Sequence, residues 1–242
     1  MKIIEEINKK QSNLYARKPI TIAFLGDSVT QGCFECFENM KGQIDTIFES
    51  GESYAEKTKK ILAKLYPTVP FAVINAGISG GTTKSALERI ERDVLAYQPD
   101  LTVVCFGLND TTLGEKGIPS YAENLEKIFS LLKEKNIETI FMTPNSMSFE
   151  QSPFLSIESL KSLSLVFADY MKQGLMDKYM ETALAAAKKY EVKVCDCYSI
   201  WKTMQDAGVN TTELLSNKLN HPDREMQWLF AYELVKCMFE SV

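Results

Sequence analysis

Apolar positions in this chain alternate between short continuous runs and longer stretches in which they recur every three or four residues. The short runs are rich in β-branched and aromatic residues, and most of them end close to a glycine or a proline. Such runs are typical of strands that are buried on both faces of a parallel sheet. Five runs are predicted to be strands: residues 20–25, 71–75, 101–106, 139–142 and 192–196.

Amphipathic stretches of helical period lie between these runs. The predicted helices are residues 2–17, 52–66 and 83–97, a helix that begins with a capping box at 119–123, residues 159–190 with a break near Gly174, and a last helix opened by His221-Pro222. Strands and helices therefore alternate, which predicts an α/β fold with a parallel sheet and helices on both faces. No repeat or linker interrupts the pattern, so residues 1–242 are predicted to form one domain.

Residues 33–50 fit neither period. They mix polar and aromatic side chains and include Gly42, so a long loop is predicted. Such a loop could wall a binding pocket or be a plain surface insertion, and the sequence leaves both readings open.

Composition narrows the class of protein. Of the 242 residues, 45% are hydrophobic and 24% are charged, which is ordinary for a globular protein. A net charge of -5 gives no reason to expect a nucleic-acid partner. No run approaches the roughly 20 apolar residues that span a bilayer, and the first residues lack the apolar core of a signal peptide. We therefore expect a cytoplasmic protein without a membrane partner, and no feature sets its oligomeric state.

Four of the six cysteines are closely spaced in pairs, Cys33 with Cys36 and Cys195 with Cys197. Together they could supply four zinc ligands. The alternative, which we favour, is that they are reduced thiols in a cytosolic protein. Neither a metal nor another cofactor is predicted.

Polar side chains follow three of the predicted strands at the point where each ends. The three segments are Gly26-Asp27-Ser28, Gly77-Ile78-Ser79 and Gly107-Leu108-Asn109. Because the carboxyl ends of parallel strands meet at one edge of a sheet, these groups are expected to converge, and ligands bind at that edge. If the only histidine, His221, joins them, the set suits acyl transfer by a serine, a basic imidazole and N–H donors.

These segments resemble the conserved blocks of the GDSL/SGNH hydrolase superfamily. The matching blocks, in the family's order, are Gly26-Asp27-Ser28, Asn75-Ala76-Gly77, Gly107-Leu108-Asn109-Asp110 and His221-Pro222. The resemblance implies a flavodoxin-like three-layer α/β/α sandwich with a parallel sheet of about five strands. It also implies that Ser28 is the nucleophile, that His221 is the base, and that Gly77 and Asn109 join the Ser28 N–H as oxyanion donors.

One block departs from the family pattern, because Lys218 occupies the position three residues before His221 where the family carries aspartate. That aspartate normally orients the imidazole. We predict a Ser–His dyad whose imidazole is oriented by a carbonyl, with the backbone of Asn217 or Lys218, or the side chain of Asn220, as candidates. A helix starting at His221 would further favour the neutral imidazole, because its positive end faces the ring.

Two other readings remain. Residues 77–81 match the G-x-S-x-G nucleophile elbow of α/β-hydrolases, which would make Ser79 the nucleophile. Alternatively, the chain is a non-catalytic relative that binds a small molecule on the same scaffold.

The favoured prediction is a serine esterase or acylhydrolase that cleaves carboxylic esters, with carbohydrate O-deacetylation as one candidate reaction. Ser28 and His221 are the predicted catalytic pair, and a small-molecule ester is the predicted partner. The predicted supporting residues are Asp27, Asp110, Ser79 and Asn220.

Overall fold

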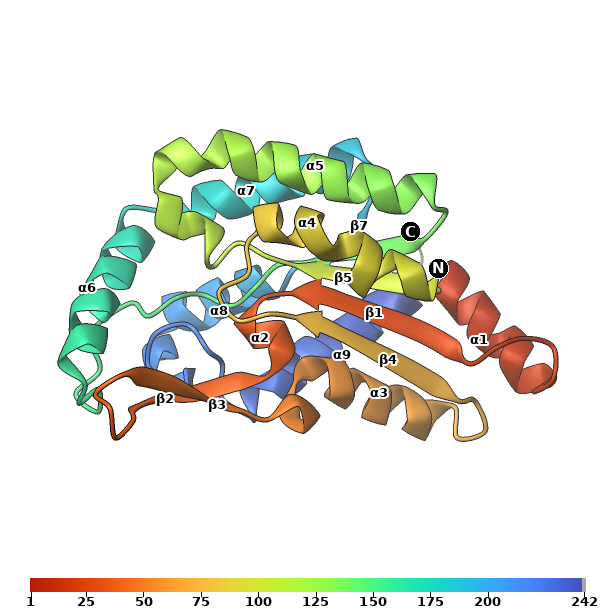
Figure 1. Ribbon diagram of the computed structural model, residues 1–242, viewed down its shortest axis with the longest axis horizontal. Helices are drawn as coiled ribbons and strands as arrows, with labels where there is room; N and C mark the ends of the chain where they lie inside the picture. The colour runs from red at the N-terminus through yellow and green to blue at the C-terminus, as the bar shows by residue number, and fades with distance from the viewer. Residues whose placement is uncertain (241–242) are drawn as a thin grey trace.

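The computed structural model describes residues 1–240, and its centre is a five-stranded parallel sheet (Figure 1). The strands are β1 (Ile20–Gly26), β4 (Phe71–Gly77), β5 (Leu101–Cys105), β6 (Glu138–Met142) and β7 (Lys193–Cys195). Every residue of β1 and β5 is buried, as continuous apolar runs in a two-sided sheet require. The five predicted strands are therefore confirmed.

The order of strands across the sheet is β4-β1-β5-β6-β7, and all pairs are parallel. This is the flavodoxin-like order, in which the direction of winding reverses between the first strand and its neighbour β5. Ligands in such sheets bind beyond the carboxyl ends of the strands at that reversal. The order thus places the residues that follow β1 and β5 at the expected binding edge.

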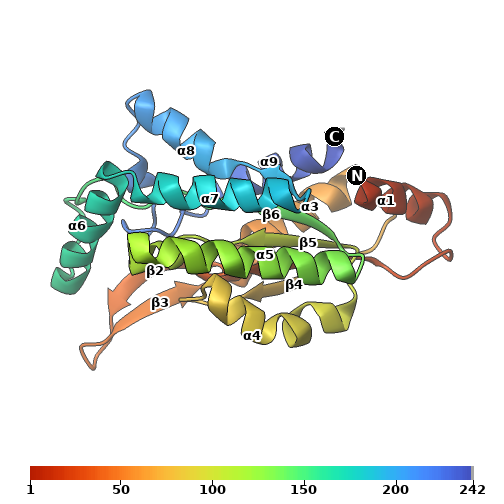
Figure 2. The ribbon, with the colours of Figure 1, turned by 90° about the horizontal axis from the view of Figure 1, so that it is seen from above.

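Helices cover both faces of the sheet and complete three layers (Figures 1 and 2). One face carries α4 (Thr83–Asp93), α5 (Ile118–Glu134) and α7 (Leu175–Lys189). The other carries α3 (Tyr54–Leu65) and α9 (Met226–Phe239), which pack on each other, while α1 (Lys2–Ser12) and α8 (Cys197–Asp206) both contact α9. The predicted break near Gly174 separates α6 (Glu158–Lys172) from α7. Helices thus lie on both faces of the parallel sheet, and the α/β sandwich predicted from the alternation is confirmed.

The region predicted to be a long loop is an antiparallel hairpin instead, made of β2 (Cys33–Glu38) and β3 (Ile44–Phe48). The hairpin and α6 lie at the end of the sheet where β1 finishes, and the N-terminus lies toward the other end (Figure 1). The chain reverses through a turn in which Gly42 has a φ of 71°, a conformation that favours glycine. The hairpin packs outside the main sheet, so it lacks the long apolar runs of the buried strands.

The ends of several predicted helices were also wrong. The first helix ends at Ser12, and α5 begins at Ile118 with a proline in its first turn and no capping box. The last helix begins at Met226, whose N–H donates to the carboxylate of Asp223, and α8 was not predicted. His221 therefore lies in an irregular segment before α9, and the predicted effect of a helix dipole on its imidazole does not apply.

Candidate active site

The turn after β1 holds Ser28 at the start of a short helix, α2 (Ser28–Gln31). Asp27 caps this helix, because its Oδ1 accepts a hydrogen bond of 3.0 Å from the N–H of Val29. Gly26 is required for the turn, since a Cβ there would lie 1.9 Å from the hydroxyl oxygen of Thr30. The N–H of Ser28 has no protein acceptor within residues 1–240, which leaves it free for a bound oxygen.

The structure brings His221 to Ser28 although 193 residues separate them in the chain. The Nε2 atom of His221 lies 3.0 Å from the Oγ of Ser28, and its Nδ1 lies 2.9 Å from the backbone oxygen of Phe34. Both side chains are almost covered, with 3% of Ser28 and 6% of His221 exposed. This is the serine–histidine contact that the sequence predicted.

The two hydrogen bonds of the imidazole fix its tautomer. A carbonyl oxygen only accepts, so Nδ1 carries the proton that is donated to Phe34, and Nε2 is free to accept from the Ser28 hydroxyl. Burial lowers the pKa of His221 below its ordinary value, and the hydrogen bond with Phe34 opposes this shift without cancelling it. The imidazole is therefore neutral near pH 7, the state that a general base requires.

The carbonyl that orients His221 comes from the β2–β3 hairpin, so each predicted candidate for this role was wrong. The ammonium of Lys218 is bonded to the backbone oxygen and carboxylate of Glu213. The side-chain oxygen of Asn220 accepts from the Nδ2 of Asn217 at 3.1 Å. A carbonyl does occupy the orienting position, as predicted, but it belongs to a residue 187 positions away.

A β-bulge explains why the Phe34 carbonyl faces His221. Cys33 pairs with Phe48 and Cys36 pairs with Thr46, so β2 has one more residue than β3 between these pairs. An extra residue of this kind interrupts the ladder and turns the local backbone groups toward other partners. The bulge includes Phe34, and it directs that residue's oxygen away from the hairpin and onto the imidazole.

Asn109 reaches the same edge from the end of β5. One N–H of its Nδ2 donates to the backbone oxygen of Gly81 at 2.9 Å. The second N–H of the same amide group takes no part in that bond. A Cβ on Gly81 would lie 3.6 Å from the Cα of Asp27, so the turn at 78–81 packs directly against the nucleophile turn. The turns after β1, β4 and β5 thus meet, as the sequence predicted.

The backbone donor from the β4 turn is less direct than predicted. The N–H of Gly77 donates to the side-chain oxygen of Asn75 at 3.0 Å, so it is already engaged. The N–H of Gly80, by contrast, has no acceptor within the part of the chain that the structure describes. Gly80 is exposed, adjoins Gly81 and has a φ of 74°, and the sequence analysis did not single it out.

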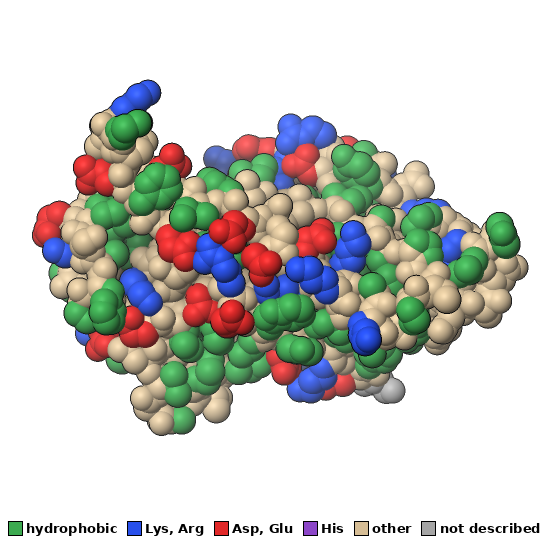
Figure 3. Space-filling model, turned by 90° about the horizontal axis from the view of Figure 1, so that it is seen from below, with side chains coloured by type: hydrophobic (Ala, Val, Ile, Leu, Met, Phe, Trp, Pro, Cys, Tyr) green, Lys and Arg blue, Asp and Glu red, His purple; other side chains and the backbone are tan. Residues whose placement is uncertain are grey.

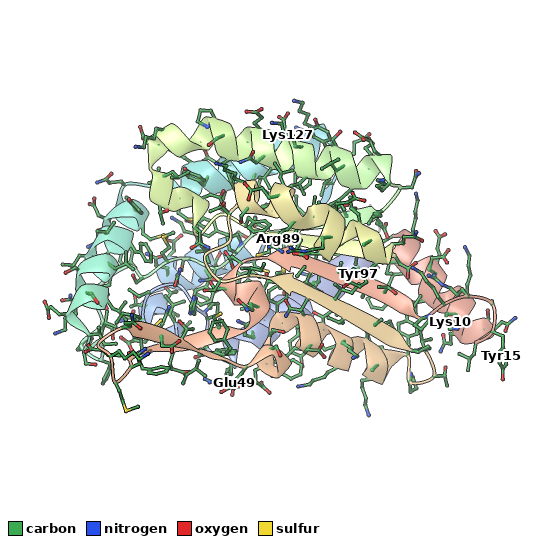
Figure 4. The ribbon with its side chains drawn as sticks, viewed as in Figure 1. Lys10, Tyr15, Glu49, Arg89, Tyr97 and Lys127 are labelled. Atoms are coloured by element: carbon green, nitrogen blue, oxygen red, sulfur yellow. The ribbon has the colours of Figure 1, made fainter. Side chains whose placement is uncertain are left out.

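Two buried aspartates brace the site. The Oδ1 of Asp110 accepts from the N–H and the hydroxyl of Thr83 at 3.0 and 2.6 Å, and so fixes the start of α4. Burial raises the pKa of Asp27 to about 7 and also raises the pKa of Asp110. Arg89, which the sequence analysis did not single out, lies over β1 and β4 (Figure 4) and donates to the backbone oxygens of Gly26 and Ala76. These contacts are consistent with the supporting role predicted for both aspartates.

Ser79 is exposed, and its backbone N–H donates to the side chain of Gln31. The only histidine of the chain is bonded to Ser28, so Ser79 has no imidazole to activate it.

The cysteines considered as zinc ligands lie in two different places. The sulfur atoms of Cys195 and Cys197 lie 3.9 Å apart, whereas Cys36 is on the hairpin. Among residues 1–240, no three histidine, cysteine, aspartate or glutamate side chains are grouped so that they could hold a metal ion.

Comparisons with known proteins identify relatives of this chain. The model of the GDSL-like Lipase/Acylhydrolase family matches residues 24–229. An acetylxylan esterase of Geobacillus stearothermophilus is 33% identical over 89 residues, which cover 37% of this chain and 39% of that protein. An arylesterase of Vibrio mimicus is 36% identical over 72 residues, which cover 29% of this chain and 34% of that protein. Each alignment thus spans less than half of the relative.

The fold is also found among solved structures. A protein from Parabacteroides merdae, described as a GDSL-like lipase, superposes with a TM-score of 0.68 at 24% sequence identity. The superposition covers 91% of this chain and 96% of that one, so the likeness extends over the whole sandwich.

Proposed function

The chain belongs to the GDSL-like lipase/acylhydrolase family, and from that premise we propose that it hydrolyses carboxylic esters through an acyl-enzyme on Ser28. The observation that carries this proposal is the 3.0 Å contact between Ser28 and the neutral imidazole of His221. A serine hydroxyl is a weak nucleophile on its own, and an adjacent base of this kind activates it.

In the first half of the reaction, the Ser28 oxygen attacks the acyl carbon while its proton moves to Nε2 of His221. The imidazolium keeps its Nδ1–H bond to the Phe34 carbonyl and then returns the Nε2 proton to the alkoxide leaving group. In the second half, water donates its proton to the same nitrogen and attacks the acyl carbon. The acid is released, and Ser28 regains its proton.

A negatively charged oxygen forms on the tetrahedral intermediate in both halves of the reaction, and its stabilisation needs hydrogen-bond donors that are already in place. We assign this role to the Ser28 N–H and to the second N–H of the Asn109 amide, neither of which has a protein acceptor among residues 1–240. Gly77 can join them only by exchanging its bond to Asn75 for one to the substrate. This arrangement requires no cofactor.

We also propose that the acyl group is small and that acetylated carbohydrates are the substrate class to examine first. The low exposure of Ser28 and His221 is the feature of the site that favours a short acyl group. Similarity to an acetylxylan esterase supports the carbohydrate part of the proposal. No helix in the described part of the chain is long and apolar enough to cross a membrane.

Hydrolysis of p-nitrophenyl acetate, butyrate and octanoate by Ser28→Ala and Ser79→Ala proteins tests both proposals. We expect Ser28→Ala to lower kcat at least about 10³-fold, with Ser79→Ala close to the unchanged protein. Acetate should be cleaved fastest, and acetylated xylooligosaccharides should release acetate. Loss of activity only in Ser79→Ala would transfer the nucleophile to Ser79, and a preference for octanoate would exclude the small acyl group.

A fluorophosphonate probe separates an enzyme from a binding protein without knowledge of the substrate. We expect covalent labelling of Ser28 in the unchanged protein and none in Ser28→Ala. An intact fold with an unlabelled Ser28 would favour the non-catalytic alternative.

A further inference from the structure

Arg224 lies three residues after His221 and connects the histidine segment to the first strand of the hairpin and to the residue just after the second strand. Its guanidinium donates to the two oxygens of Glu35 at 2.6 and 3.0 Å and to the two oxygens of Glu49 at 2.8 and 2.9 Å. Acidic and basic side chains lie side by side on the lower face of the molecule (Figure 3), and Glu49 is on that side (Figure 4). One planar cation thus holds two carboxylates, a geometry that lysine cannot reproduce.

The same guanidinium covers the residue that orients the base. Its central carbon lies 4.3 Å from the centre of the Phe34 ring, within the range of a cation–π contact. Glu35 follows Phe34 within the bulge of β2, and the N–H of Glu49, just beyond β3, donates to the oxygen of Gly32 at 2.8 Å. Arg224 is therefore bonded on both sides of the point where the hairpin presents its carbonyl to His221.

Strand pairing gives the orienting carbonyl little support, although the side chain of Phe34 is fully buried. Phe34 belongs to an interrupted ladder, and the hairpin that carries it lies outside the main sheet. A family aspartate close to the histidine would move together with it, whereas a carbonyl 187 residues away moves with a different element. Some contact must hold the two elements in register, and Arg224 makes the only ion pairs between the hairpin and residues 216–225 in the part of the chain that the structure describes.

We propose that Arg224, clamped by Glu35 and Glu49, is a positioning residue that holds the Phe34 carbonyl against His221 and so takes over the orienting role of the missing aspartate. The proposal rests on His221 being the base of the proposed hydrolysis. Arg224 neither touches the reacting atoms nor donates a proton in the reaction. Its effect on rate passes through the tautomer and the orientation of the imidazole.

The tautomer of the His221 imidazole can be measured directly, because His221 is the only histidine of the chain. In a protein without an added histidine tag, the imidazole nitrogens seen by ¹⁵N NMR belong to this residue alone. Arg224→Met removes the clamp and keeps much of the side chain's apolar length, while Arg224→Lys keeps the charge without the fork. Arg17→Met is the matched control, since Arg17 also links two carboxylates, those of Glu6 and Asp100, at the other end of the sheet.

We expect the unchanged protein and Arg17→Met to show one tautomer, protonated at Nδ1. Arg224→Met should show both tautomers, and its kcat should fall about 10- to 100-fold with KM within about twofold, since small misplacements of a reacting group have effects of this size. Arg224→Lys should lie between the two. If Arg224→Met does not fold, Glu35→Gln and Glu49→Gln together test the same clamp.

An unchanged tautomer in a folded clamp variant would overturn the proposal, whether or not activity falls. A rise in KM at unchanged kcat would also overturn it, because Arg224 would then act on the substrate. The NMR measurement needs no substrate, so it judges the clamp even if Ser28→Ala retains activity and the proposed hydrolysis fails.

Discussion

The turn that carries Ser28 and the segment that carries His221 are built in different ways. The Ser28 turn follows a fully buried strand and is fixed by the buried side chains of Asp27 and Arg89. The His221 segment has no regular structure and is tied to a hairpin by a carbonyl and an arginine with about a third of its side chain exposed. The difference teaches that the nucleophile depends on a buried strand, whereas the base depends on polar contacts between an irregular segment and a hairpin outside the main sheet. Changes behind Ser28 should therefore affect stability first, and changes around His221 should affect rate first.

Replacing the base should give the largest effect. His221→Gln removes the proton acceptor while keeping a side chain of similar polarity, and kcat/KM for p-nitrophenyl acetate should fall about 10²- to 10⁴-fold. The melting temperature should change little, because the core contacts of this segment, made by Leu215 and Leu219, are left in place. Lys218→Gln serves as the control and should remain within about twofold in rate. Equal rates for His221→Gln and the unchanged protein would exclude His221 as the base.

Behind the nucleophile, Asp27→Asn should act on stability and on its pH dependence. The folded protein raises the pKa of Asp27 to about 7 from 3.8, mainly through burial, so the unfolded chain ionises first. Stability is then fully present below pH 3.8 and is lost as the pH rises through 7. Between pH 5 and 8, the unchanged protein should lose about 2 to 3 kcal/mol of unfolding free energy relative to Asp27→Asn. Urea unfolding at both pH values measures this loss, and parallel pH dependences would contradict it.

Around the base, Asn217→Ala should lower activity more than stability, the reverse of what is expected for Asp27→Asn. The side-chain oxygen of Asn217 accepts from the N–H groups of Leu219, Asn220 and His221, each at 3.0 Å. Its loss should lower kcat about 10-fold through a less ordered histidine, while stability falls by about 1 kcal/mol. Asn210→Ala removes a similar bond to Thr212 in a neighbouring turn and is the control. If Asn217→Ala loses stability but no activity, the contrast between the two regions is wrong.

The smallest expected effect is on the acidic side of the pH profile. Burial lowers the pKa of His221 below its ordinary value of 6.5, and only the neutral imidazole accepts a proton. Measured kcat/KM at pH 6.5 should therefore stay above half of its value at pH 8, and it should fall tenfold per pH unit only at lower pH. An acidic limb centred above pH 6.5 would indicate that the site stabilises the imidazolium more than the structure suggests.

The sequence predicted the regular half of the site because buried parallel strands leave a strong pattern. Apolar runs located Ser28 and Asn109 at strand ends, and the parallel sheet brought those ends together. The support of His221 left no comparable signal, since it depends on a contact with Phe34 across 187 residues. The period-two alternation expected of the hairpin is broken by its bulge, so residues 33–50 were predicted to be a loop. Short polar motifs near His221 suggested a helix start, but they form turns that long-range contacts stabilise.

The long chain separation of Ser28 and His221 has a consequence for folding kinetics. Closing a long loop costs more chain entropy than closing a short one, and domains rich in contacts this distant in sequence fold slowly. During refolding from urea, circular dichroism should recover before esterase activity does. The appearance of product would then mark the docking of the last segments, so the proposed activity would report on the completion of the tertiary structure.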